Sequence, residues 1–239
     1  MPITLDPLPL NAAAAAARPL AGLTVLVVED SRFASEAVRL LCLKSGARIR
    51  RADSLRAARR HLSIYSPTAV IIDLGLPDGS GVDLIRDLAN AHNRIPVILA
   101  TSGDDRQFIP ATEAGADGIL EKPIESLAAF QRAVLENLPP DQCPSGLRVV
   151  SNEVVSPDPI AFRDDLAHIA DVLTASDDDM TLDYVTQFLT GVARSAHDHD
   201  LEDAVVSLAS RRTSGGSIRS DLARVAGLLQ DRIEDRQAI

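Results

Sequence analysis

Three continuous apolar segments of strand length constrain the fold of this chain more than any other feature. They are LTVLVV at residues 23–28, AVII at 69–72 and PVILA at 96–100. A strand with one face in water alternates apolar and polar residues, whereas a strand covered on both faces is apolar throughout. We therefore expect a parallel sheet that is buried between two layers of helices.

Helical patterns lie between these segments, and the alternation continues to Leu138. Two further strands are expected at residues 47–52 (ARIRRA) and 117–120 (DGIL). Five strands that alternate with five helices predict an α/β fold with a doubly wound, five-stranded parallel sheet, because right-handed crossovers place helices on both faces. This domain is expected to span residues 22–138, after a flexible, Ala-rich arm at residues 1–21.

The chain changes character after this domain. Residues 139–158 are rich in proline and lack periodicity, which predicts a linker. Residues 159–239 carry four apolar stripes at helical spacing, which predicts a second, smaller all-α domain. From Pro140 onward, 18 acidic residues stand against nine arginines and no lysine, in a chain with a net charge of −10. That surface would repel a phosphate backbone, so nucleic acid is disfavoured as a partner.

The cysteines and the hydropathy bear on location. Cys42 and Cys143 have neither disulfide nor metal-ligand spacing, and Cys42 lies in an apolar helical stretch, where we expect a small buried side chain. This usage favours a reducing, cytoplasmic setting. No segment approaches the roughly 18 apolar residues of a membrane-spanning helix, so we expect no membrane association.

Polar side chains follow the predicted strands where they end. Glu29 and Asp30 follow the first strand, Asp73 the third, Thr101 the fourth and Lys122 the fifth. Ligands of a doubly wound sheet bind outside the carboxyl ends of its strands. Two carboxylates about 4 Å apart repel by roughly 4 kcal/mol at an effective dielectric constant near 20, so this acidic group calls for a cation. Oxygen ligands at an exposed rim favour Mg²⁺.

Four motifs occur in a fixed order along the first domain: VVEDS, IIDLGLPDGSG, ILATSG and LEKP. Together they resemble the receiver domain of bacterial two-component response regulators, which has a flavodoxin-like fold. The resemblance covers residues 22–138. It implies that Asp73 accepts a phosphoryl group from a sensor histidine kinase or a phosphotransfer protein, since a carboxylate can attack phosphorus to form an aspartyl phosphate.

The resemblance also implies how Mg²⁺ would be held. Asp30 and Asp73 would bind the ion directly, and Glu29 would act through water. The carbonyl of Gly75 would complete the protein ligands.

Further roles follow from the same resemblance. Thr101 would hydrogen-bond a phosphoryl oxygen, Lys122 would pair with the phosphoryl group, and Pro123, after a cis peptide bond, would fix the loop that carries the lysine. Receivers often have Tyr or Phe three residues before this lysine, where the present chain has Ile119. We therefore expect a switch through loop and helix shifts near Thr101 in place of the usual coupling between an aromatic side chain and the threonine.

Two glycines stand close to the expected site. Gly75 and Gly103 each lie two residues beyond a predicted site residue, Asp73 and Thr101 respectively. Because neither position has a side chain, we expect water to reach an acyl phosphate here without obstruction.

Three interpretations of the C-terminal helices stay open. They could contact an unknown output protein or a second copy of the chain. They could form an atypical DNA reader of a transcription regulator, although only RRTSGGSIRSDLAR comes near a basic recognition helix. They could form a histidine-phosphotransfer-like bundle of a phosphorelay intermediate, with His168, His197 or His199 as the candidate histidine. None of the three is followed by the lysine of that pattern, so each is better explained as a titrating surface residue. In each case we expect no enzyme activity beyond self-phosphorylation and self-dephosphorylation.

Overall fold

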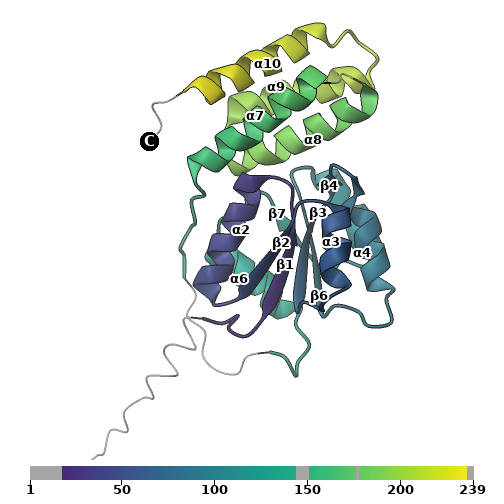
Figure 1. Ribbon diagram of the computed structural model, residues 1–239, viewed down its shortest axis with the longest axis vertical. Helices are drawn as coiled ribbons and strands as arrows, with labels where there is room; N and C mark the ends of the chain where they lie inside the picture. The colour runs from purple at the N-terminus through teal and green to yellow at the C-terminus, as the bar shows by residue number, and fades with distance from the viewer. Residues whose placement is uncertain (1–17, 144–150, 176–177, 236–239) are drawn as a thin grey trace, which may run out of the picture.

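The computed structural model describes residues 18–143, 151–175 and 178–235, which form an α/β unit with a bundle of helices stacked on one end of its sheet (Figure 1). The central sheet has five parallel strands in the order β2-β1-β3-β6-β7. The strands are β1 (Thr24–Val28), β2 (Arg48–Ala52), β3 (Ala69–Asp73), β6 (Val97–Ser102) and β7 (Gly118–Glu121). This order confirms the predicted doubly wound sheet.

Helices cover both faces of the sheet. On one face lie α2 (Arg32–Ser45) and α6 (Leu127–Glu136), and on the other lie α3 (Leu55–Leu62), α4 (Gly81–Ala89) and α5 (Phe108–Ala114), with a short 3₁₀ turn, η1 (Asp105–Gln107), before α5. Successive residues of β3 point to opposite faces, so that Ile71 joins the core under α2 and α6 while Ile72 joins the core under α3, α4 and α5. Burial on both faces explains why this strand contains no polar residue before Asp73.

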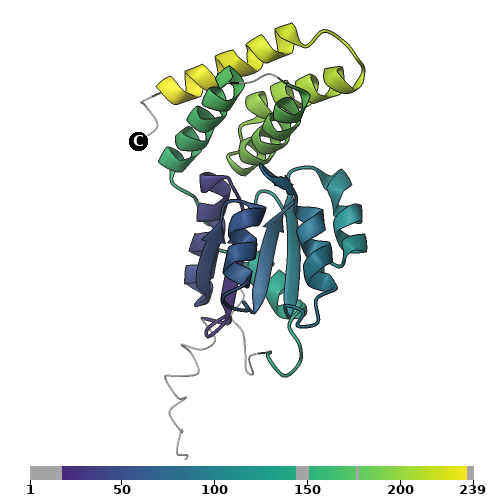
Figure 2. The ribbon, with the colours of Figure 1, turned by 45° about the vertical axis from the view of Figure 1, so that its right-hand side comes forward.

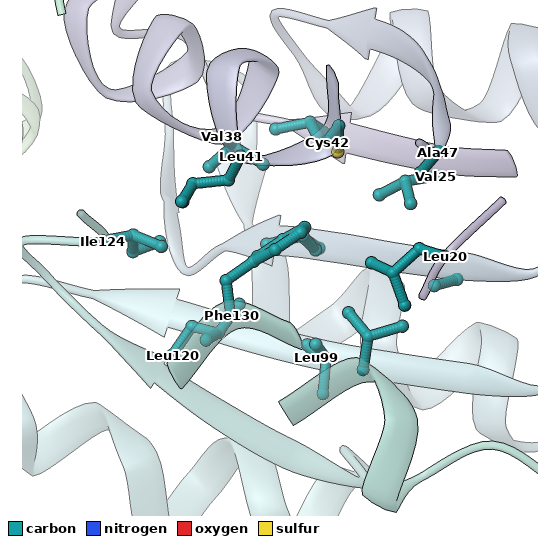
Figure 3. Close-up of a cluster of buried hydrophobic side chains, with 14 of the residues drawn as sticks. Leu20, Val25, Val38, Leu41, Cys42, Ala47, Leu99, Leu120, Ile124 and Phe130 are labelled. Carbon is teal, nitrogen blue, oxygen red and sulfur yellow. The ribbon is translucent and has the colours of Figure 1, made fainter. Parts of the chain in front are cut away.

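The core between the sheet, α2 and α6 is centred on Phe130. Figure 3 shows its ring among Leu41 of α2 and Leu99 and Leu120 of the strands. Leu20 is also fully buried in this core, and its N–H donates to the carbonyl of Ser45 at 2.9 Å. The packing of Leu20 therefore ties the chain to the α/β unit before residue 22, whereas residues 1–17 of the expected arm lie outside the described residues.

Cys42 belongs to the same core and is fully buried. Burial raises the pKa of its thiol to about 12, and the thiolate is the reactive form. We expect iodoacetamide to modify the half-buried Cys143 of the native protein at neutral pH and to leave Cys42 unmodified, as mass spectrometry of the digested protein would show. Unfolded protein, with both thiols alkylated, is the control. Alkylation of both at equal rates in the native state would contradict this packing.

A short hairpin after β3 was not predicted from the sequence. It consists of β4 (Gly75–Leu76) and β5 (Gly79–Ser80), and α4 begins directly after it at Gly81. A Cβ atom at Gly81 would overlap the backbone carbonyl of Asp73. The glycine therefore lets the start of α4 pack directly against the end of β3.

The segment expected as a linker packs on the α/β unit where it is described. The N–H of Val155 donates to the carbonyl of Glu125 at 2.9 Å, and the N–H of Leu127 donates to the carbonyl of Glu153 at 3.0 Å. Val155 is buried in the core of α2 and α6. This segment thus fixes the chain against the N-terminus of α6 shortly before the bundle begins.

Four helices form the bundle: α7 (Pro159–Ala175), α8 (Asp179–Ser195), α9 (His199–Thr213) and α10 (Arg219–Glu234). Their apolar stripes meet in one core that includes Leu166, Leu189, Val205 and Leu229. The second, all-α region is therefore confirmed. Within the described ranges, no helix has both the length and the apolar character needed to cross a membrane.

The bundle sits over the carboxyl ends of the strands. Both views place α7 and α8 at this end of the sheet, with α7 next to α2 and α8 next to β4 (Figures 1 and 2). The end of the sheet at which ligands are expected is thus covered by helices.

Candidate functional site

The carboxyl ends of β1, β3 and β7 bring three charged side chains together. The ammonium Nζ of Lys122 lies 2.8 Å from Oε2 of Glu29 and 3.0 Å from Oδ2 of Asp73. All three side chains are buried. Residues that lie far apart in the sequence thus meet at one edge of the sheet, as the strand ends predict.

Asp30 completes an acidic group around this lysine. One carboxylate oxygen from each of Glu29, Asp30 and Asp73 lies within 4.8 Å of the other two. Oxygens at this spacing could bind one divalent cation together.

The electrostatics of this group show a deficit of positive charge. Burial, and then the charge of Asp73, raise the pKa of Glu29 well above its usual value and raise the pKa of Asp30 to about 7. Burial alone would lower the pKa of Lys122, but Asp73 and Glu29 outweigh it, so that this pKa is raised. One ammonium group thus faces three carboxylates, and a cation would relieve their repulsion.

Two buried polar atoms of this site have no hydrogen-bond partner among the described residues: Oδ1 of Asp30 and Oγ1 of Thr101. Buried polar atoms are hydrogen-bonded in most proteins, so each of these points to a group that the fold itself does not supply. Thr101 of β6 is the register partner of Asp73 on β3. Asp30 therefore suits a cation, and Thr101 suits an oxygen-bearing group next to Asp73.

The remaining predicted residues surround this group. The N–H of Gly75 donates to Oδ1 of Asp73 at 3.4 Å. The Lys122–Pro123 peptide bond is cis, as the resemblance implies. Ile119 is partly buried and packs with the core under α3, α4 and α5. The functional roles of these residues stay predictions.

Helix α8 covers the site, which the sequence reasoning missed. The hydroxyl of Tyr184 donates to Oδ2 of Asp30 at 2.8 Å. A Cβ atom at Gly75 would overlap the side chain of Gln187, and one at Gly103 would come within 2.9 Å of Cα of Gly191. The expectation that water passes freely over these two glycines is wrong for this structure, because α8 fills that space. The two glycines were the only sign of this in the sequence. Their lack of side chains leaves space that a helix can occupy as well as water.

The three histidines of the bundle lie on its surface. His168 and His199 are exposed, and Nε2 of the exposed His197 lies 3.0 Å from Oε2 of Glu125. These positions agree with their interpretation as surface residues.

Comparison with known proteins matches a family model, described as the response regulator receiver domain, to residues 25–133. The KDP operon transcriptional regulatory protein KdpE of Escherichia coli K12 is 37% identical over 114 residues, which are 46% of this chain and 50% of KdpE. The virulence transcriptional regulatory protein PhoP of Salmonella typhimurium (strain 14028s) is 32% identical over 145 residues, 55% of this chain and 65% of PhoP. The chain therefore spans half of one relative and under two thirds of the other.

A solved receiver domain from Methylobacillus flagellatus is 32% identical, with a TM-score of 0.42. The match covers 47% of this chain and 98% of that domain. The names of KdpE and PhoP describe transcriptional regulation, so these relatives do not support the expectation that nucleic acid is disfavoured as a partner. The strand order and the family match agree, and residues 25–133 of this chain belong to the response regulator receiver domain family, followed by a separate helical region.

Proposed function

We propose that the chain is a cytoplasmic response regulator of a two-component phosphorelay and accepts a phosphoryl group on Asp73. The donor is a sensor histidine kinase or a phosphotransfer protein. The observation that carries this proposal is the buried contact of Lys122 with both Glu29 and Asp73 at the carboxyl ends of the strands. A lysine held at 3.0 Å from one carboxylate oxygen of Asp73 is suited to offset the charge of a group bound there.

The transfer itself requires little from the protein beyond position and charge. An oxygen of Asp73 forms a bond to phosphorus as the bond from phosphorus to the donor nitrogen breaks. The buried strand β3 holds this carboxylate in place, which in-line transfer requires. Lys122 pairs with the phosphoryl group, and the unpartnered hydroxyl of Thr101 donates to one of its oxygens.

The residues present fit Mg²⁺: Asp30, Asp73 and the Gly75 carbonyl would hold the ion directly, and Glu29 would act through water. When bound, the ion would supply positive charge beside the transferring oxygens. The unpartnered Oδ1 of Asp30 and the repulsion among three acids support this assignment. The chain then acts as a phosphoacceptor that undergoes self-phosphorylation and self-dephosphorylation, and not as an enzyme with a separate substrate.

The output is proposed to pass through protein contacts of the helical region, with another protein or with a second copy of the chain. A phosphoryl group adds a charge of roughly −1.5 to −2 at neutral pH. Because α8 lies directly on the site, the added charge would act on the bundle directly, without a chain of intervening residues.

A transcription regulator with an atypical DNA reader is the second candidate, and the names of KdpE and PhoP favour it. Binding to random duplex DNA at several salt concentrations separates the two. We expect no salt-dependent binding. From Pro140 onward, 18 acidic residues stand against nine arginines, and this net negative charge repels phosphates. Affinity that falls steeply with added salt would favour the DNA reader.

The test of the phosphoacceptor is incubation with acetyl phosphate and Mg²⁺, followed by intact-mass measurement. The wild type and an Asp53→Asn variant, which changes an exposed acid, should both gain the mass of one phosphoryl group. The Asp73→Asn variant should gain none, because an amide does not form the acyl phosphate. Equal gain by Asp73→Asn would exclude Asp73 as the acceptor.

A further inference from the structure

Helix α8 presents three residues to the receiver site from one helical face. Tyr184, Gln187 and Gly191 follow the spacing of residues that lie above one another on a helix. Tyr184 contacts Asp30, Gln187 lies against Gly75, and Gly191 lies against Gly103. We call these three residues the α8 face.

The α8 face lies very close to the receiver backbone. A Cβ atom at Gly103 would lie 2.9 Å from Cα of Gly191, which is closer than real Cβ atoms approach, and 3.1 Å from the amide nitrogen of Gly191. A Cβ atom at Gly191 would lie 3.3 Å from Nζ of Lys122. The absence of side chains at Gly103 and Gly191 is therefore what allows α8 to lie this close to the lysine.

The α8 face also leaves the proposed site closed. Asp73 is only 8% exposed and Thr101 only 2%. A donor molecule must bring its phosphorus into contact with an oxygen of Asp73, and Thr101 must then reach the transferred group. With α8 packed against Gly75 and Gly103, little of the Asp73 side chain is accessible to a phosphodonor.

Tyr184 holds the helix on a proposed metal ligand. Its hydroxyl donates to Oδ2 of Asp30 at 2.8 Å. Burial, and then the charge of Asp30, raise the pKa of Tyr184, so the hydroxyl stays protonated and remains a donor. A neutral hydroxyl satisfies one oxygen of Asp30 but does not neutralise the three acids, as a cation would.

A second set of polar contacts holds the bundle at the edge of the site. Asp165 of α7 is buried and accepts hydrogen bonds from Oγ of Ser31 at 2.7 Å, from the N–H of Arg32 at 2.9 Å and from the N–H of Phe33 at 3.0 Å. These groups form the N-terminus of α2, directly after Asp30, where a carboxylate is favoured. Polar contacts of this kind are common between domains that move relative to one another.

We propose that α8 is an autoinhibitory lid: its docking excludes the loading of the site with a divalent cation and a phosphodonor, and Tyr184 is the residue that competes for Asp30. This inference rests on the proposed function. Because the coupling is reciprocal, loading of the site favours release of the α8 face, which then becomes available to an output partner.

The first test measures Mg²⁺ affinity by isothermal titration calorimetry on the full chain. Tyr184→Phe removes only the hydroxyl, and we expect the Kd for Mg²⁺ to fall by roughly tenfold, since hydrogen bonds to charged groups are among the stronger ones. Tyr65→Phe is the matched control, because it changes the other tyrosine of the chain, and should leave the Kd unchanged. Equal Mg²⁺ affinities of Tyr184→Phe and Tyr65→Phe would overturn the proposal that Tyr184 competes with the cation for Asp30.

The second test measures the rate of phosphorylation by acetyl phosphate with Mg²⁺. Gly191→Leu places a side chain between α8 and Lys122 and should raise the rate by roughly tenfold or more, while leucine favours the helix itself. Gly227→Leu is the matched control, because a Cβ atom at this exposed helical position meets nothing within 4 Å, and it should react at the wild-type rate. Circular dichroism verifies that both variants keep their helices.

The outcomes separate the two proposals. If the wild type and Gly191→Leu are phosphorylated at equal rates, α8 is not a lid, while the phosphoacceptor role stands. If neither chain takes up a phosphoryl group, the proposed function itself fails. Faster uptake by Gly191→Leu, lost again on adding Asp73→Asn, supports both.

Discussion

Replacing Lys122 by methionine lowers the free energy of unfolding by about 3 to 5 kcal/mol in the absence of divalent cations, the usual cost of removing one partner from a buried ion pair. The substitution leaves Glu29 and Asp73 buried beside each other without the ammonium group that now lies 2.8 and 3.0 Å from them. Urea denaturation followed by far-UV circular dichroism measures the loss. Mg²⁺ should restore part of it, because a bound cation replaces the missing positive charge.

Lys44→Met is the control for this variant. Lys44 pairs with Glu153 at 2.6 Å, but the two side chains are 40% and 47% exposed. An exposed pair contributes less than about 1 kcal/mol, so this variant should be nearly as stable as the wild type. If Lys122→Met were no less stable than Lys44→Met, the buried charge cluster would not exist as described.

Phe130→Ala is expected to lower the free energy of unfolding by about 3 to 5 kcal/mol as well, since it removes a large side chain and leaves a cavity. Phe130 is only 1% exposed and lies at the centre of the core between the sheet, α2 and α6 (Figure 3). Thermal unfolding, compared at equal buffer conditions, measures the loss through the midpoint temperature.

Phe108→Ala provides the matched comparison. Phe108 is half-buried at the edge of the other core, so its truncation should have less than half of the effect of Phe130→Ala. Equal losses from the two variants would show that Phe130 is not a central core residue.

The sheet and its helices could be predicted because burial on both faces leaves a strong pattern. Val25 and Ile71 contact one core, while Leu26 and Ile72 contact the other, so the buried middle of each strand is apolar. The meeting of Asp73 and Lys122 follows from the same fact, because parallel strands end at the same edge of the sheet. The four helices of the bundle were predictable from their apolar stripes for a similar reason.

The position of the bundle could not be predicted in this way. Periodicity tells which face of a helix is apolar, but Tyr184 and Gly191 contact the receiver through a polar group and a bare backbone, which leave no periodic pattern. Gly75 and Gly103 look the same in the sequence whether they face water or a helix. The distinction depends on packing between units that are far apart in the chain.

Short segments were misjudged for a related reason. Val155 lies in a proline-rich stretch and Leu20 beside an alanine-rich one, and the surrounding composition suggested that both were outside the folded unit. Each is buried because a single apolar side chain fits the core of α2 and α6. A single buried residue cannot be recognised from hydrophobic periodicity, which requires several apolar residues at regular spacing.

Borohydride reduction of the protein after treatment with acetyl phosphate and Mg²⁺, followed by peptide mass spectrometry, tests most directly whether Asp73 is the phosphoacceptor. Borohydride converts an aspartyl phosphate to homoserine and leaves free carboxylates unchanged. We predict homoserine at position 73 and at no other acidic residue. Homoserine at a different position, or unmodified Asp73 in protein that carries a phosphoryl group, would contradict the central claim.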